Sequence, residues 1–154
     1  MTTTSDSKTL VEELPTTPDN TVNQTGKQMA AAAPMKCTSL ATNTVLGYLS
    51  TYNANLSIVE KKDNKAVAQV YWTQYGSHLC LAKDTEPGER WLGPGKPQEG
   101  DKAEWGLGKN YCYLKYDSNT GTISVENQDL MLYWDGSYVR WGVQNQNTIG
   151  LKFT

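Results

Sequence analysis

Residues 132–141 decide the fold class, and they read Leu132-Tyr133-Trp134-Asp135-Gly136-Ser137-Tyr138-Val139-Arg140-Trp141. Two runs rich in aromatic and apolar residues flank the Asp-Gly pair, which supplies the positive φ that a tight type I′ turn requires. Such runs on both sides of a short turn predict an antiparallel β-hairpin.

Two further segments, 70–81 and 111–125, repeat this plan. Each consists of an aromatic-rich run, a short polar turn that contains Gly, and a second run in which apolar residues alternate with polar ones. The recurrence predicts a repeated all-β unit.

Strand-forming runs follow one another with short gaps, so we expect roughly twelve short antiparallel strands and no long helix. The predicted strands are 35–40, 46–51, 55–61, 66–73, 77–83, 90–92, 103–107, 111–116, 122–127, 130–134, 137–141 and 148–153. Divided near Gly76 and near Gly121, this region gives three parts of about four strands each, which favours a β-trefoil because its closed barrel leaves no strand edge open. β-Propeller-like blades and a meander barrel are the alternatives.

The N-terminal segment differs from the rest of the chain. Residues 1–34 contain no aromatic side chain and carry Pro15, Pro18 and Pro34. A segment with so little apolar surface to bury cannot offset the entropy of ordering it. We therefore expect a disordered tail over 1–34 and a single all-β domain over 35–154.

Charge and hydropathy restrict the classes of partner that the sequence predicts. The net charge is -2, and charged residues make up 19% of the chain without forming a basic stripe, so nucleic acid is not expected. Membrane insertion is not expected either, because no apolar run approaches the roughly 20 residues that cross a bilayer. The N-terminus lacks the pattern of a secretory signal, which predicts a cytoplasmic location or export by another route.

The sequence favours a protein that is not an enzyme. His78 is the only histidine, and the three cysteines, Cys37, Cys80 and Cys112, contain no Cys-x-x-Cys pair, so neither a metal nor another cofactor is expected. We place His78 and Cys80 on opposite faces of one strand, which would keep them from forming a nucleophile pair. Cys80 and Cys112 are interpreted as small buried hydrophobic residues, with a bridge between them as the alternative.

The aromatic residues suggest a binding surface. Neighbouring residues of a strand face opposite sides, so one ring of Tyr71-Trp72 and one of Tyr133-Trp134 should face outward. An outward Trp or Tyr offers an apolar ring with a polar edge, which suits the C–H face and the hydroxyls of a sugar. The alternative is that these rings pack the core. The candidate carbohydrate-binding residues are Trp72, Trp91, Trp105, Tyr111, Glu126, Trp134, Asp135 and Trp141.

Residues 91–126 resemble one blade-to-blade passage of the fucose-binding propeller lectins. The resemblance lies in Trp91-Leu92-Gly93, a strand that ends in Trp105, the aromatic strand 113–116 and a strand that ends in Glu126. It implies a sugar-binding role for Trp91 and Glu126. The strand that carries a sugar-binding arginine in that family has Lys115 as its only basic residue here, so the resemblance does not extend to fucose specificity.

The preferred function is that of a lectin, a non-catalytic carbohydrate-binding protein with two or three related shallow sites. Its partners would be glycans or glycoproteins, and the sequence also allows a homo-oligomer. One alternative is a protease inhibitor on a β-trefoil, using the loop 84–100 with Pro87, Pro94 and Pro97. Another is an assembly module whose aromatic surface forms a subunit interface.

Overall fold

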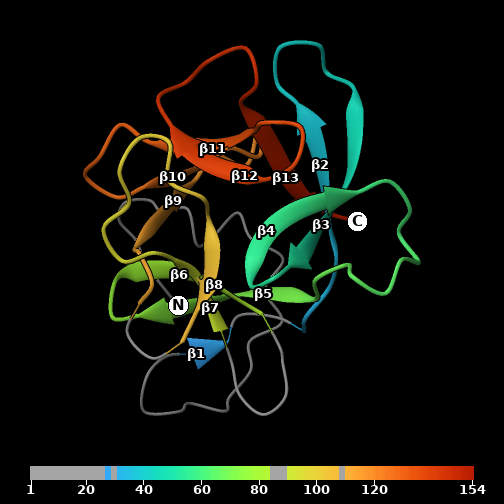
Figure 1. Cartoon of the computed structure of the whole chain (residues 1–154). Helices are drawn as coiled ribbons and strands as arrows, with labels where there is room; N and C mark the ends of the chain where they lie inside the picture. The colour runs from blue at the N-terminus through green and yellow to red at the C-terminus, as the bar shows by residue number, and fades with distance from the viewer. Residues whose placement is uncertain (1–26, 29–30, 84–89, 108–109) are drawn as a thin grey trace.

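The protein is all-β over the residues that the computed structural model describes, which are 27–28, 31–83, 90–107 and 110–154. No helix occurs among them, and the predicted all-β class is confirmed (Figure 1). The strands are β1 Lys27–Gln28, β2 Met35–Ser39, β3 Val45–Tyr52, β4 Asn55–Val59, β5 Val70–Tyr75, β6 His78–Lys83, β7 Arg90–Gly93, β8 Glu104–Gly106, β9 Leu114–Tyr116, β10 Ile123–Val125, β11 Met131–Trp134, β12 Val139–Gly142 and β13 Ile149–Phe153.

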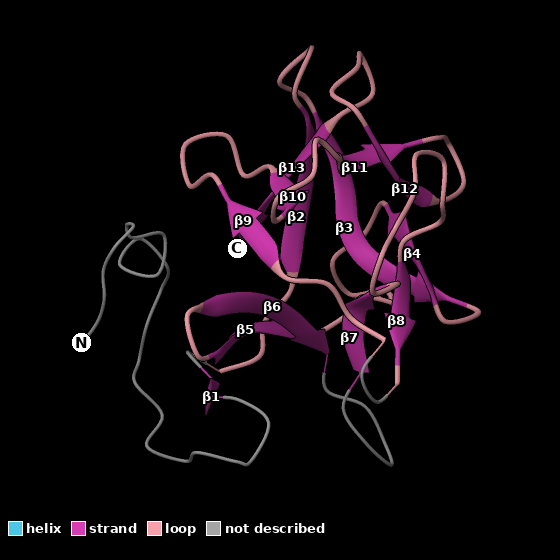
Figure 2. Ribbon diagram, turned by 90° about the vertical axis from the view of Figure 1, so that its left-hand side faces the viewer, coloured by secondary structure: helices cyan, strands magenta, loops and turns pink. Residues whose placement is uncertain are grey.

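All of these strands join one antiparallel sheet. Its order is β12-β11-β10-β9-β6-β7-β8-β4-β3-β2-β13, and β5 pairs with β6 and with β1 off this path. The sheet curls so that Tyr133 of β11 forms a bridge with Thr148, next to β13, while Arg140 of β12 forms one with Lys102, just before β8 (Figure 2).

This pairing excludes two of the architectures considered from the sequence. A propeller distributes its strands over separate blades, whereas the described strands share one sheet. A meander barrel pairs each strand with the next one along the chain and closes by pairing the last with the first, whereas here β6 also pairs with β9 and β4 with β8.

Every predicted strand has a counterpart, but the tight turn was assigned to the wrong hairpin. Asn53 and Ala54, between β3 and β4, both have positive φ, as a type I′ turn requires. In the hairpin of β11 and β12, only Gly136 has positive φ, and Trp134 pairs with Val139 across a longer loop. The Asp135 carboxylate closes that loop, because its Oδ1 accepts hydrogen bonds from the backbone N–H groups of Ser137 and Tyr138.

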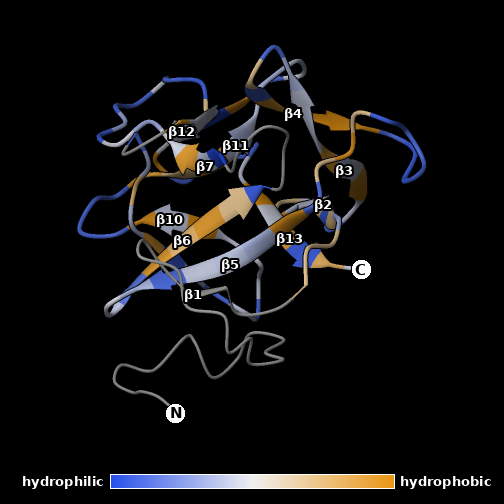
Figure 3. Ribbon diagram, turned by 90° about the horizontal axis from the view of Figure 1, so that it is seen from below, coloured by the Kyte–Doolittle hydropathy of each residue, from blue (hydrophilic) through white to orange (hydrophobic). Residues whose placement is uncertain are grey.

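The core is built from the inward side of the curled sheet. It contains Trp72, Trp105 and Trp141 together with leucines and valines from nearly every strand. Tyr71 is also buried, at 1% exposure, although it points to the other side of β5 from Trp72. The expectation that one of these two rings faces solvent is wrong, because Tyr71 lies on a part of the outer side, with Thr73, Cys80 and Ala82, that is also buried. β6 is mostly hydrophobic along its length, while β5 beside it is more polar (Figure 3).

The predicted tail, 1–34, lies mostly outside the described residues. Its described part takes part in the sheet: Lys27 and Gln28 form β1 against β5, and the backbone of Ala33 exchanges two hydrogen bonds with that of Val70. Pairing with β5 therefore begins before the boundary expected near Pro34.

Candidate binding site

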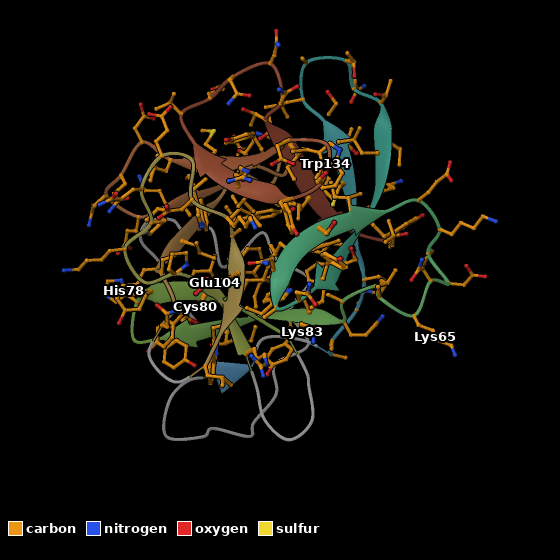
Figure 4. All side chains as sticks on the ribbon, viewed as in Figure 1. Lys65, His78, Cys80, Lys83, Glu104 and Trp134 are labelled. Atoms are coloured by element: carbon orange, nitrogen blue, oxygen red, sulfur yellow. The ribbon has the colours of Figure 1, made fainter. Side chains whose placement is uncertain are left out.

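The outer side of β6 positions the candidate site. Leu79 and Leu81 of β6 belong to the core, so His78, Cys80 and Ala82 between them face the other side. His78 and Cys80 are two residues apart and share this side, so the expectation that they face opposite ways is wrong (Figure 4). Residues paired across neighbouring strands lie on the same side of the sheet. Tyr75 of β5, which pairs with His78, and Trp91 of β7, which pairs with Ala82, therefore lie on this outer side too.

Five rings gather on this side of the sheet, and we call them the aromatic face: Tyr75, His78, Trp91, Tyr111 and Tyr113. Tyr111 is their centre, with ring centroids 5.3 Å from Tyr75, 5.7 Å from Trp91 and 6.1 Å from Tyr113. Tyr113 stacks in turn on the His78 ring, with centroids 4.0 Å apart and planes 6° from parallel. The rings thus form one continuous row from Trp91 to His78.

Glu126 adds a carboxylate at one end of the row. Its Oε1 lies 3.0 Å from Nδ1 of His78, and the two side chains are 26% and 40% exposed. The pair fixes the imidazole over Tyr113 and leaves hydrogen-bonding atoms of both side chains accessible to solvent. A ligand that stacks on the rings would meet polar groups at their edge.

Two titratable groups on this side, Tyr111 and Cys80, have raised pKa values. Burial raises the pKa of Tyr111, and the neighbouring Tyr75, Tyr113 and Cys80 raise it further. Burial also raises the pKa of Cys80 to about 12, with added contributions from Cys112 and Glu126. The phenol and the thiol therefore keep their protons at neutral pH, so Tyr111 can donate a hydrogen bond and Cys80 is a poor nucleophile.

The structure brings together three of the eight predicted site residues. Trp91, Tyr111 and Glu126 come from three different segments and meet on the aromatic face or at its edge. Only the alternation in Tyr111-x-Tyr113 and in His78-x-Cys80 could have indicated that the remaining members lie on the same side. Tyr75, His78 and Tyr113 were not predicted as site residues.

Three of the predicted residues belong to the core instead. Trp72, Trp105 and Trp141 are 2%, 1% and 0% exposed, so their rings offer no surface to a sugar. Their apolar area is satisfied by core packing, and the indole N–H of Trp141 also donates a 3.1 Å hydrogen bond to the carbonyl of Gly93. We remove these three from the candidate site.

Trp134 and Asp135 lie away from the aromatic face, and Figure 4 shows Trp134 on a different part of the molecule from His78. Trp134 is partly buried against the core. Asp135 forms an ion pair with Arg140. Burial alone would raise the pKa of Asp135, but hydrogen bonds from Arg140, Tyr138 and Ser137 outweigh it, and the pKa is lowered. This cluster holds the β11–β12 hairpin together.

The loop considered for protease inhibition is only partly described. Residues 84–89 lie outside the described ranges, and Arg90–Gly93 form strand β7. The rest is tied to the body: the Gly95 N–H donates to Asn110, the Gln98 N–H donates to Asp101, and Pro97 is buried. The described part is therefore a strand and an anchored turn.

Comparisons with known proteins add no assignment. No family model, curated protein or solved structure matches this chain. Within the described residues, no group of His, Cys, Asp and Glu side chains is arranged to hold a metal ion. Those residues also include no helix of the length and apolarity needed to cross a membrane.

Proposed function

We propose that this protein binds carbohydrate without catalysis and that the aromatic face is its binding site. The observation that carries the proposal is the row of partly exposed rings with the His78–Glu126 pair at its end. A sugar ring can lay its C–H face on Tyr111 and Tyr113 while its hydroxyls bond to the carboxylate, the imidazole and the phenol groups. Trp91 and Glu126, which the resemblance to fucose-binding lectins also implicates, lie at the two ends of the row.

We also propose that the strands form a β-trefoil of three units, β2–β5, β6–β9 and β10–β13. The strand pairings support this division, because the same three kinds of pairing occur in every unit. The first strand pairs with the second in β2–β3, β6–β7 and β10–β11, and the second with the third in β3–β4, β7–β8 and β11–β12. The fourth pairs with the first strand of the next unit in β5–β6, β9–β10 and β13–β2.

The core residues support the same division. Aligning the units by these pairings brings buried apolar residues together at several inward positions. Three such sets are Met35, Leu81 and Ile123; Leu49, Leu92 and Leu132; and Val70, Leu114 and Leu151. The boundaries fall at Gly76 and Gly121, the two glycines at which the sequence divides.

The aromatic face belongs mainly to the second unit. Its positions hold different residues in the first and third units: Trp91 aligns with Tyr48 and Met131, Tyr111 with Val67 and Thr148, and His78 with Ala32 and Thr120. We therefore propose one sugar site in each chain, in place of the two or three related sites that the repeated hairpins suggested.

A glycan array of the intact protein tests the proposal, followed by titration of the best glycan against two variants. Tyr113→Ala removes an exposed ring of the aromatic face, and we expect about tenfold weaker binding, from the loss of about 1.4 kcal/mol of stacking and contact area. Tyr52→Ala is the matched control, because Tyr52 is an exposed tyrosine whose ring contacts Tyr138, away from the face. Its affinity should equal that of the wild type.

A blank array would overturn the proposal. Equal glycan affinity of the wild type, Tyr113→Ala and Tyr52→Ala would contradict the assignment of the site. A blank array together with concentration-dependent dimerisation, lost in Tyr113→Ala, would instead assign the aromatic face to self-association, which its composition also suits.

A further inference from the structure

Three buried polar groups next to the aromatic face have no hydrogen-bond partner among the described residues: Tyr71 Oη, Thr73 Oγ1 and Trp91 Nε1. Tyr71 and Thr73 are 1% and 4% exposed. Buried polar groups are nearly always paired in native proteins, because an unpaired group loses its hydration without compensation. Tyr116 follows that rule, since its buried hydroxyl donates a 2.7 Å hydrogen bond to the carbonyl of Leu151.

The three groups lie on one side of three adjacent strands. Tyr71 of β5 is opposite Ala82 of β6, and Ala82 is opposite Trp91 of β7, so the small Ala82 side chain separates the two large rings. Thr73 is the next residue on the same side of β5, followed by Tyr75, which belongs to the aromatic face. The unpaired groups are therefore contiguous with that face and do not lie in the main core.

We propose that Tyr71, Thr73 and Trp91 form a hydroxyl-binding subsite that completes the sugar site and takes one hydroxyl group of a neutral sugar. This inference rests on the proposed carbohydrate-binding function. The donors and acceptors of these three side chains determine which ligand group fits the subsite. The indole of Trp91 only donates, so the ligand must offer an acceptor, while the hydroxyls of Tyr71 and Thr73 both donate and accept.

A sugar hydroxyl meets both requirements, because it accepts from the indole and donates to a hydroxyl. An ammonium group has no acceptor for the indole N–H. A carboxylate on the ligand would be repelled by Glu126 at the far end of the face. Entry requires the Trp91 ring to turn. That ring is partly exposed and its N–H has no described partner, so no hydrogen bond opposes the movement.

The first test is the stability of the ligand-free protein. Tyr71→Phe removes only an unpaired hydroxyl, so we expect its Tm to equal or exceed that of the wild type. Tyr116→Phe is the matched control: it removes a buried tyrosine hydroxyl that is paired, and its Tm should fall. A Tyr71→Phe protein that loses as much Tm as Tyr116→Phe would overturn the inference, because its hydroxyl would then be paired within the protein.

The second test is titration with the methyl glycosides of glucose, galactose and mannose and with their single-deoxy analogues. Tyr71→Phe should bind a glycoside that the wild type binds about three- to tenfold more weakly, which is the effect of one neutral hydrogen bond. For the analogue that lacks the inserted hydroxyl, wild type and variant should bind equally.

The outcomes separate the two proposals. Unchanged affinity of Tyr71→Phe for every glycoside would overturn the subsite and leave the carbohydrate function standing. If the wild type binds none of these glycosides and no glycan on the array, the function and the subsite fall together.

Discussion

Replacing Trp141 by Phe should destabilise the protein more than replacing Trp105 by Phe. The two tryptophans hold matching places: Trp105 pairs with Leu92, Trp141 pairs with Leu132, and both rings are almost completely buried. The indole N–H of Trp141 donates to the Gly93 carbonyl at 3.1 Å, whereas that of Trp105 has no partner among the described residues. The lost volume is the same in both variants, so it largely cancels in the comparison.

The remaining difference is electrostatic. Trp141→Phe loses a hydrogen bond that contributes about 1 kcal/mol, while Trp105→Phe removes an unpaired donor whose burial costs about 1 kcal/mol. The free energy of unfolding should therefore differ between the two variants by about 2 kcal/mol, with Trp141→Phe the less stable. That is a large part of the roughly 5–15 kcal/mol by which a domain is stable.

Equilibrium unfolding in urea, followed by circular dichroism, measures this difference. Trp72→Phe serves as a further control, because Trp72 is a buried tryptophan whose indole N–H is also unpaired in the described part of the chain. Its loss in free energy of unfolding should resemble that of Trp105→Phe. Equal costs for all three variants, or a larger cost at Trp105 than at Trp141, would refute the reasoning.

Three further predictions follow from the geometry. Calorimetry with the best glycan should give one site per chain; two or three sites would contradict the assignment to a single unit. The lowered pKa of Asp135 means that its pairing with Arg140 stabilises the protein above the unfolded carboxyl's pKa and is lost as the pH falls through the folded value. Asp135→Asn should therefore destabilise the protein by less than about 1 kcal/mol at pH 7 and not near pH 2, in denaturant titrations at both pH values. Burial raises the pKa of Cys80 and of Cys112 to about 12, so a thiol reagent at pH 8 should label neither until the protein is unfolded, as mass spectrometry can show.

The strands could be predicted from the sequence because their signals are local. Alternation and turn residues lie within a few positions of each other, and all predicted strands from 35 onward have counterparts in the sheet. The turn at Asp135 was misjudged for a local reason too: its carboxylate accepts two backbone N–H groups and stabilises a longer loop than Asp-Gly usually forms.

The burial of individual rings could not be predicted, because it depends on what covers each side of the sheet. Tyr71 and Trp72 would alternate between core and solvent on a sheet with one exposed side, but the middle parts of β5 and β6 are buried on both sides. The residues that form the candidate site were equally hard to predict from the sequence. His78 and its partner Glu126 are 48 positions apart, and no periodicity in the sequence relates them.

The aromatic face differs from the core in a way that points to function. In the proposed trefoil, several inward positions hold similar apolar residues in all three units, as expected where packing decides the choice. The outward positions of the second unit carry stacked rings, and three buried polar groups without described partners lie beside them. Stability alone does not favour unpaired buried groups, and in the proposed trefoil the first and third units lack most of these rings. Tyr71 and Thr73 belong to the first of the proposed units and Trp91 to the second, so we propose that a ligand bound where these two units meet explains the unpaired groups.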